Sequence, residues 1–320
     1  MKRQIQFLLV ASLALSVTFF SCKKTDSATT DNSSEVSATA DDQASFSQTT
    51  DDVANDGNSL IDNSAAFQGR VTGTTDPNNV TNLAPPCDAT VVLDSANGLR
   101  RLTVTYNGTP CRPHITRTGV VVFTMPLGQH WVDAGAVLTM SVQNLVVTTV
   151  GLSTNRSITI NGTASVTNVS GGRLRDLSTL GTIIHDIASS GMTVTFENGT
   201  SRQWQVSKRR TFTYNNGVVI STVGTHTDGS ITGIAEWGTN RFGNPFATAI
   251  TQPMTIRQDC AWRITSGQLT HYKLAATVVV TFGLDSTGNP TSCPGTGTYY
   301  YKFVWTGANG TTVTVIRPYN

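Results

Sequence analysis

Six Asn-Gly pairs and one Asp-Gly pair divide the chain after residue 90 into short segments, and these pairs constrain the fold more than any other feature. Both central residues of a type I′ turn need a positive φ, which Asn and Gly tolerate and β-branched residues do not. Each pair therefore predicts a two-residue hairpin turn. The pairs are Asn97-Gly98, Asn107-Gly108, Asn161-Gly162, Asn198-Gly199, Asn216-Gly217, Asn309-Gly310 and Asp228-Gly229.

The segments between these turns alternate at the period of a β-strand. Around Asn198-Gly199, for example, Val194 and Phe196 are expected to share a face with Trp204 and Val206. The segment 174–188 comes nearest to a helix, but Gly181 and the β-branched residues after it predict a loop that runs into a strand. Further Val- and Thr-rich runs lie near residues 89–95, 101–106, 118–125, 136–150, 156–169, 229–237, 246–257, 261–268 and 274–283.

Roughly a dozen strands at this turn spacing, without helices between them, predict an all-β fold. The expected architecture is an antiparallel β-sandwich or barrel-like stack whose strands are joined by Asn-Gly hairpins. We expect one all-β domain over residues 68–320. Two smaller sandwiches that meet near residue 190 are the alternative.

The first 22 residues have the layout of an export signal. Lys2 and Arg3 precede an apolar stretch over residues 7–20, and Ser21-Cys22 follows it. Residues 1–21 therefore predict a signal peptide. A small residue before a cysteine at this place resembles the lipobox of bacterial lipoproteins, and Phe19 with Ser-Cys-Lys-Lys is similar to the Bacteroidota type. The resemblance implies that Cys22 is acylated and anchors the protein in the outer membrane. An uncleaved helix or an ordinary secretory signal is the alternative.

Residues 22–67 differ in composition from the rest of the chain. From residue 25 to residue 67 there are nine acidic residues and no Lys or Arg. This composition predicts a disordered acidic tether that follows the lipidated cysteine. From residue 68 onward 18 Lys and Arg face 11 Asp and Glu. The positive domain predicts an acidic polysaccharide or other glycan as a partner, whereas the scattered arginines do not predict a nucleic-acid site.

Four cysteines remain when Cys22 is set aside, namely Cys87, Cys111, Cys260 and Cys293. An even number in an exported chain predicts disulfides, and four cysteines allow three connectivities. We favour Cys87 with Cys111 and Cys260 with Cys293, because each pair brackets a hairpin-like segment. A zinc site is the alternative, but the spacing of the cysteines and histidines does not support one.

The stretch 80–320 also resembles a group of β-rich exported lipoproteins to which no activity has been assigned. The resemblance implies export and β architecture, and it implies no chemistry. It rests on Cys87, a Tyr-Asn-Gly turn before Cys111, Arg117-Thr118-Gly119, Asp133-Ala134-Gly135-Ala136-Val137, Cys260-Ala261-Trp262-Arg263 and Cys293 before the last hairpin.

Motifs that carry catalysis, cofactors or metals are missing from the sequence. The histidines stand singly in the sequence. His185 beside Asp186, or His130 near Asp133, could bind a metal or form an acid–base pair only if the fold brought another ligand close. Glu236, beside Trp237, is the one carboxylate that suggests glycoside hydrolysis, which needs a second carboxylate nearby. Glu197 is expected to be a solvated turn residue. Trp131, in an expected loop, is the tryptophan most expected to be exposed.

Two functions follow from these observations. The first is a membrane-anchored, non-enzymatic binding or structural β module of the cell envelope, with Trp131, Trp237 and Glu236 as candidate ligand contacts. The second is a carbohydrate-active hydrolase that uses Glu236 with an unidentified second carboxylate. Attachment to the outer membrane is expected, and the sequence leaves open whether the domain faces the exterior or the periplasm.

Overall fold

The computed structural model describes residues 27–68, 85–111, 115–150, 155–189, 191–273, 276–293, 297–307 and 310–319. The expected signal peptide, Cys22, His114 and Asn309 of the last predicted turn lie outside these ranges. None of the described helices combines the length and the apolarity needed to cross a membrane.

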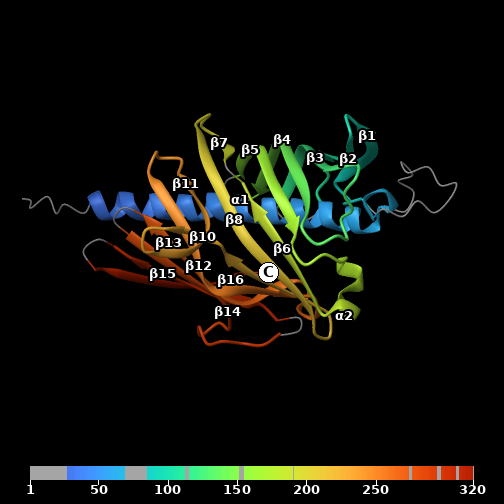
Figure 1. The fold of residues 1–320 in the computed structure, drawn as a ribbon. Coiled ribbons are helices and arrows are strands. Elements are labelled where there is room, and N and C mark those ends of the chain that lie inside the picture. Colours follow the sequence, from blue (N-terminus) through green and yellow to red (C-terminus); the bar gives the residue numbers. More distant parts are fainter. Residues whose placement is uncertain are drawn as a thin grey trace, which may run out of the picture.

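The β-strands form one antiparallel sheet of 16 strands, which confirms the predicted all-β fold (Figure 1). β8 pairs with β6, which precedes residue 190, and with β7, β9 and β11, which follow it, so the sheet is continuous there and does not divide into two sandwiches. The strands are β1 (Ala89–Ala96), β2 (Leu99–Asn107), β3 (Ile115–Pro126), β4 (Ala136–Val150), β5 (Asn155–Asn168), β6 (Thr182–Ala188), β7 (Met192–Phe196), β8 (Ser201–Tyr214), β9 (Val218–Gly224), β10 (His226–Asp228), β11 (Ile231–Thr239), β12 (Pro245–Arg257), β13 (Arg263–Lys273), β14 (Ala276–Leu284), β15 (Tyr299–Thr306) and β16 (Thr312–Tyr319).

Most of the predicted turns join neighbouring strands. Asn97 and Gly98 both have positive φ, 52° and 74°, as a type I′ turn requires. The prediction for Asn161-Gly162 is wrong, because this pair lies inside β5. There the Asn161 side chain accepts the backbone N–H of Asn144, opposite an irregularity in β4. Asn107-Gly108 ends β2 but begins a longer connection rather than a two-residue hairpin.

The predicted disordered tether is wrong over most of its length, because residues Ser27–Asn63 form the long helix α1. Figure 1 shows α1 running across the strands of the sheet. Residues Ala65–Gln68 continue it as the short helix η1. An isolated helix of this Ser-, Thr- and Asp-rich composition would be marginal in water, so its stability has to come from packing against the sheet.

A buried stripe along α1 provides this packing. Thr39, Phe46, Val53 and Leu60 are spaced seven residues apart, and each is at most 6% exposed. This is the period of one helix face. The stripe is hard to see in the sequence because Thr, Gln, Asn and Asp occupy many of its other positions. The repeat of Phe46, Val53 and Leu60 is the signal that could have found it.

We call the face of the sheet that contacts α1 the inner face. The main core lies between them and draws on α1 and on strands from β1 to β12. Two smaller clusters complete it, one on β14 and β15 and one beneath α2. The segment 174–188 begins with the short helices η2 (Leu174–Asp176) and α2 (Leu177–Leu180) and continues as β6, and η3 (Gln258–Cys260) lies between β12 and β13.

Candidate functional site

Glu236 lies on the inner face of β11, where α1 covers it. Its side chain is 1% exposed and accepts a hydrogen bond from Gln43 of α1 at 2.9 Å. Lys208 of β8 places its Nζ atom 2.5 Å from Glu236 Oε1 and 3.4 Å from Asp51 Oδ1. The second carboxylate near Glu236 therefore comes from α1, the segment expected to be a tether.

The surrounding charges hold Lys208 and Asp51 in their ionised forms. Burial alone would lower the pKa of Lys208, but Asp51 and Glu236 outweigh it and raise that pKa. Burial would raise the pKa of Asp51, but Arg210 and Lys208 outweigh it and lower that pKa. A glycosidase needs a carboxylic acid with a raised pKa and an open path for the sugar. Asp51 is ionised, and Glu236 is paired beneath the helix.

Further ion pairs join α1 to the strands and turns of the sheet. Arg117 of β3 is 2% exposed and forms two 2.8 Å hydrogen bonds to Asp88 and one of 2.9 Å to Asp56 of α1. Tyr106 donates its hydroxyl to the same Asp56. On the N-terminal half of α1, Asp42 accepts a hydrogen bond from Arg241 at 2.7 Å.

These contacts explain why the sequence combines an acidic segment with a basic domain. The acidic residues of α1 neutralise buried cations of the sheet, because an unpaired buried charge is strongly unfavourable. The excess of positive charge after residue 68 therefore has an internal partner in the same chain. It does not require an acidic partner outside the protein.

The other candidate acid–base groups do not converge on Glu236. His185 and Asp186 point to opposite faces of β6: His185 is buried between Trp131 and Phe212, and Asp186 pairs with Arg209 on the outer face. Burial and Arg210 lower the pKa of His185 to about 3, so the ring is neutral at physiological pH.

The remaining pairs lie at the ends of strands. His130 and Asp133 form an exposed pair at 3.3 Å. Glu197 is exposed, as its turn position predicts, and it also pairs with Arg241 at 3.1 Å and accepts the backbone N–H of Ser157. Arg241 also binds Asp42, so Glu197 belongs to the ion-pair group on the N-terminal half of α1.

The two candidate tryptophans are not free ligand contacts. The sequence predicts an exposed Trp131, but this residue is completely buried, and its backbone N–H donates to the carbonyl of Phe67 at the end of η1. The prediction is wrong because the loop folds inward to close the end of the core. Trp237 is half-buried on β11 and stacks on His226, with ring centroids 3.9 Å apart.

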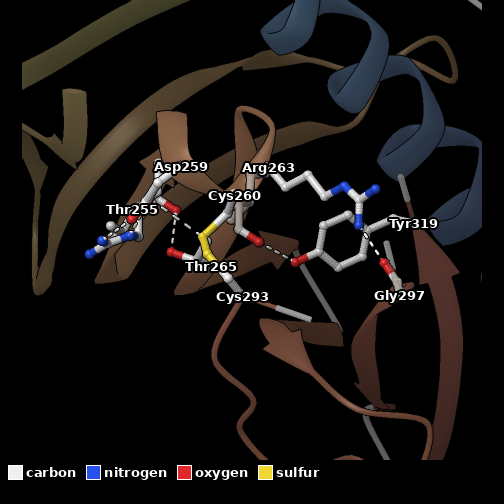
Figure 2. Close-up of a disulfide and its surroundings, with 10 residues drawn as sticks. Thr255, Asp259, Cys260, Arg263, Thr265, Cys293, Gly297 and Tyr319 are labelled. Carbon is white, nitrogen blue, oxygen red and sulfur yellow. Dashed lines mark hydrogen bonds and ion pairs between the residues drawn. A yellow bond between two sulfur atoms is a disulfide. The ribbon is translucent and has the colours of Figure 1, made fainter. Parts of the chain in front are cut away.

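Both favoured cysteine pairings are confirmed. Cys87 pairs with Cys111 and Cys260 with Cys293, with Cα–Cα distances of 5.9 and 5.3 Å. Figure 2 shows the second disulfide with Asp259 beside it and Arg263 reaching the carbonyl of Gly297. Ligand atoms of Asp259, Cys260 and Cys293 lie within 4.8 Å of one another. The two sulfur atoms are bonded to each other, and three groups are fewer than the four of a structural zinc site.

The most exposed aromatic residues of the described part of the chain lie at both ends of the sheet, with Phe242 at 52% in the β11–β12 turn and two others at the opposite end. Trp262 is 52% exposed and Tyr214 is 54% exposed. Ala261 and Trp262 both have positive φ, 56° and 59°, immediately after Cys260. For residues other than glycine this conformation costs about 1–2 kcal/mol per residue. Trp262 is not among the site residues predicted from the sequence, although its place two residues after a paired cysteine is visible there.

No family model, curated protein or solved structure matches this chain. Its function therefore has to be inferred from the fold and the side-chain contacts.

Proposed function

We propose that this protein is a lipid-anchored, non-enzymatic binding module of the bacterial cell envelope, attached to the outer membrane through Cys22. The observation that carries the proposal is that α1 covers the inner face of the sheet and pairs with its buried charges. A ligand therefore meets the ends and the outer face of the sheet, where aromatic side chains are exposed.

The path of α1 supports a particular orientation. Asn240 and Asn244, in the turn between β11 and β12, donate to Glu35 at 2.9 and 2.7 Å, and Asn240 also contacts Thr39. Towards the N-terminus, Ser27 is five residues after Cys22. An acyl chain on Cys22 would hold the β11–β12 turn nearest the bilayer. The opposite end of the sheet would face away from it.

Two experiments test this function. Metabolic labelling with a clickable fatty acid is expected to tag the wild-type protein and not a Cys22→Ala variant; equal labelling of both would contradict the anchor. A glycan-array screen of the full chain carrying Cys22→Ala is expected to show retention of at least one glycan class without release of reducing ends. Retention of no glycan would contradict a glycan-binding role, and turnover lost in Glu236→Gln would establish a hydrolase.

Protease shaving of intact cells addresses the side of the membrane. We propose that the domain is exposed on the cell surface, where glycans are reachable. Cleavage on intact cells supports this placement. Protection until the outer membrane is permeabilised would assign the domain to the periplasm.

A further inference from the structure

Three exposed side chains lie at the end of the sheet opposite the β11–β12 turn, on different segments of the chain, and we call Leu180, Tyr214 and Trp262 the distal patch. Tyr214 ends β8, 14 residues long, whose other end lies beside that turn. At about 3.3 Å per residue, β8 separates the two ends by roughly 40 Å. The distal patch is therefore remote from the point at which α1 leads to Cys22.

Strand register and hydrogen bonds place the three residues at the same end of the sheet, on successive segments. Thr182, two residues after Leu180, pairs with Thr213, and Tyr214 pairs with Val218. The backbone N–H of Val218 donates to the Gln258 side chain at 2.8 Å. Trp262 then follows in the η3 turn, where its N–H donates to the carbonyl of Arg257.

The segment that presents Trp262 is held firmly. Cys260 is buried and bonded to Cys293, and Arg257 pairs with Asp259 at 2.6 Å within the same turn. Two consecutive non-glycine residues in the left-handed region keep the backbone in an uncommon conformation around an exposed ring. A rigid exposed ring loses little entropy when a ligand stacks on it.

We propose that the distal patch is the ligand site of the binding module, and that its ligand is a polysaccharide chain whose sugar rings stack on Trp262 and Tyr214. This inference rests on the proposed function. Sugar rings combine apolar C–H faces with hydroxyl groups, which matches aromatic rings beside the polar side chains of Gln258 and the Arg257–Asp259 pair. Three separate apolar side chains are too few for a stable protein interface, which usually buries more than about 1,000 Å².

Stacking rather than charge should dominate the binding. The cations in the η3 turn are already engaged, Arg257 with Asp259 and Arg263 with the Gly297 carbonyl. Retention is therefore expected to change less than about twofold between roughly 0.1 and 0.5 M NaCl, since salt screens charges and leaves stacking largely intact.

The test compares Trp262→Ala with Phe242→Ala in the full chain carrying Cys22→Ala. Phe242 is also 52% exposed, but it lies in the β11–β12 turn at the other end. The probes are immobilised neutral and acidic polysaccharides. For a glycan that wild type retains, Trp262→Ala is expected to weaken binding at least tenfold, whereas Phe242→Ala leaves it unchanged. Both variants should keep the wild-type unfolding midpoint, because neither side chain is buried.

The possible outcomes distinguish a failure of the proposed ligand site from a failure of the proposed function. Equal binding by wild type and Trp262→Ala would overturn the distal patch and leave the glycan-binding function standing. Retention of no polysaccharide by wild type would overturn the function itself. Concentration-dependent self-association that Trp262→Ala abolishes, measured by sedimentation without glycan, would overturn the saccharide assignment in favour of a contact between copies of the chain.

Discussion

The strands that α1 covers and the C-terminal strands have similar sequences but different surroundings. In β8 every second residue from Trp204 to Phe212 is buried against the helix side of the sheet. In β16, none of the residues Thr312–Tyr319 is buried, although Val313 and Val315 alternate in the same way. Alternation therefore identifies a strand, and the burial of its apolar face depends on the element that covers it.

Charged residues show the same difference. Lys208, Arg210 and Arg117 are each at most 5% exposed in the covered region, and each has an aspartate of α1 as a partner. On β16, Arg317 is exposed to solvent. The helix thus allows the sheet to carry cations at buried positions, where an unpaired charge would be strongly unfavourable.

The largest expected effect comes from removal of the helix. A chain that begins at residue 69 should show no cooperative unfolding transition in urea, because it exposes the main core and leaves three buried cations without their helix partners. Tryptophan fluorescence reports this, since Trp131 and Trp204 are buried. A chain that begins at residue 27 is the control and should unfold cooperatively. A cooperative transition of the shorter chain at the same midpoint would show that α1 is dispensable.

A single substitution tests the charges. Asp51→Ala removes the partner that Lys208 and Arg210 share, and it is expected to lower the free energy of unfolding by about 3–5 kcal/mol. Gln48→Ala, at an exposed position on the same helix, is the matched control and should change it by less than about 0.5 kcal/mol. Equal effects of the two substitutions would show that the buried charges do not depend on α1.

The sequence predicts most of the strands in both regions, but it does not predict the helix that covers one of them. Turn residues and alternation identify most strands, because both signals are local. The helix escapes prediction because polar residues such as Thr39, Asp42 and Gln43 occupy its buried stripe, and their partners are far away in the sequence. The burial of Glu236 and Trp131 escapes prediction for the same reason, since at either position it depends on the segment formed by α1 and η1.

Acid should destabilise the covered region through His185. Its pKa is about 3 in the folded protein and near 6.5 when unfolded, so the unfolded chain binds more protons between these values. Stability is therefore present above pH 6.5 and falls as the pH decreases towards 3, by on the order of 5 kcal/mol in total at about 1.4 kcal/mol per pKa unit. His185→Leu takes up no proton and should show a shallower decline in urea titrations over this range. Parallel pH profiles of the two proteins would contradict this.

The smallest expected effects come from the same Val→Ala substitution at one buried position of α1 and at one position on the uncovered β16. Val53→Ala, in the buried stripe of α1, should lower the free energy of unfolding by about 2 kcal/mol through lost burial and a residual cavity. Val313→Ala, at a position that is 46% exposed on β16, should change it by less than about 0.5 kcal/mol. Equal losses in chemical denaturation would mean that the two regions are covered alike.

Hydrogen–deuterium exchange of the full chain tests most directly whether α1 is an integral part of the core. If it is, amides from residue 39 to residue 62 are expected to exchange as slowly as those of β8, because both would open only with the fold. The amides of β16 should exchange faster. Complete exchange of residues 39–62 within seconds, with β8 still protected, would show that this segment is a tether after all and would contradict the integral role of the helix.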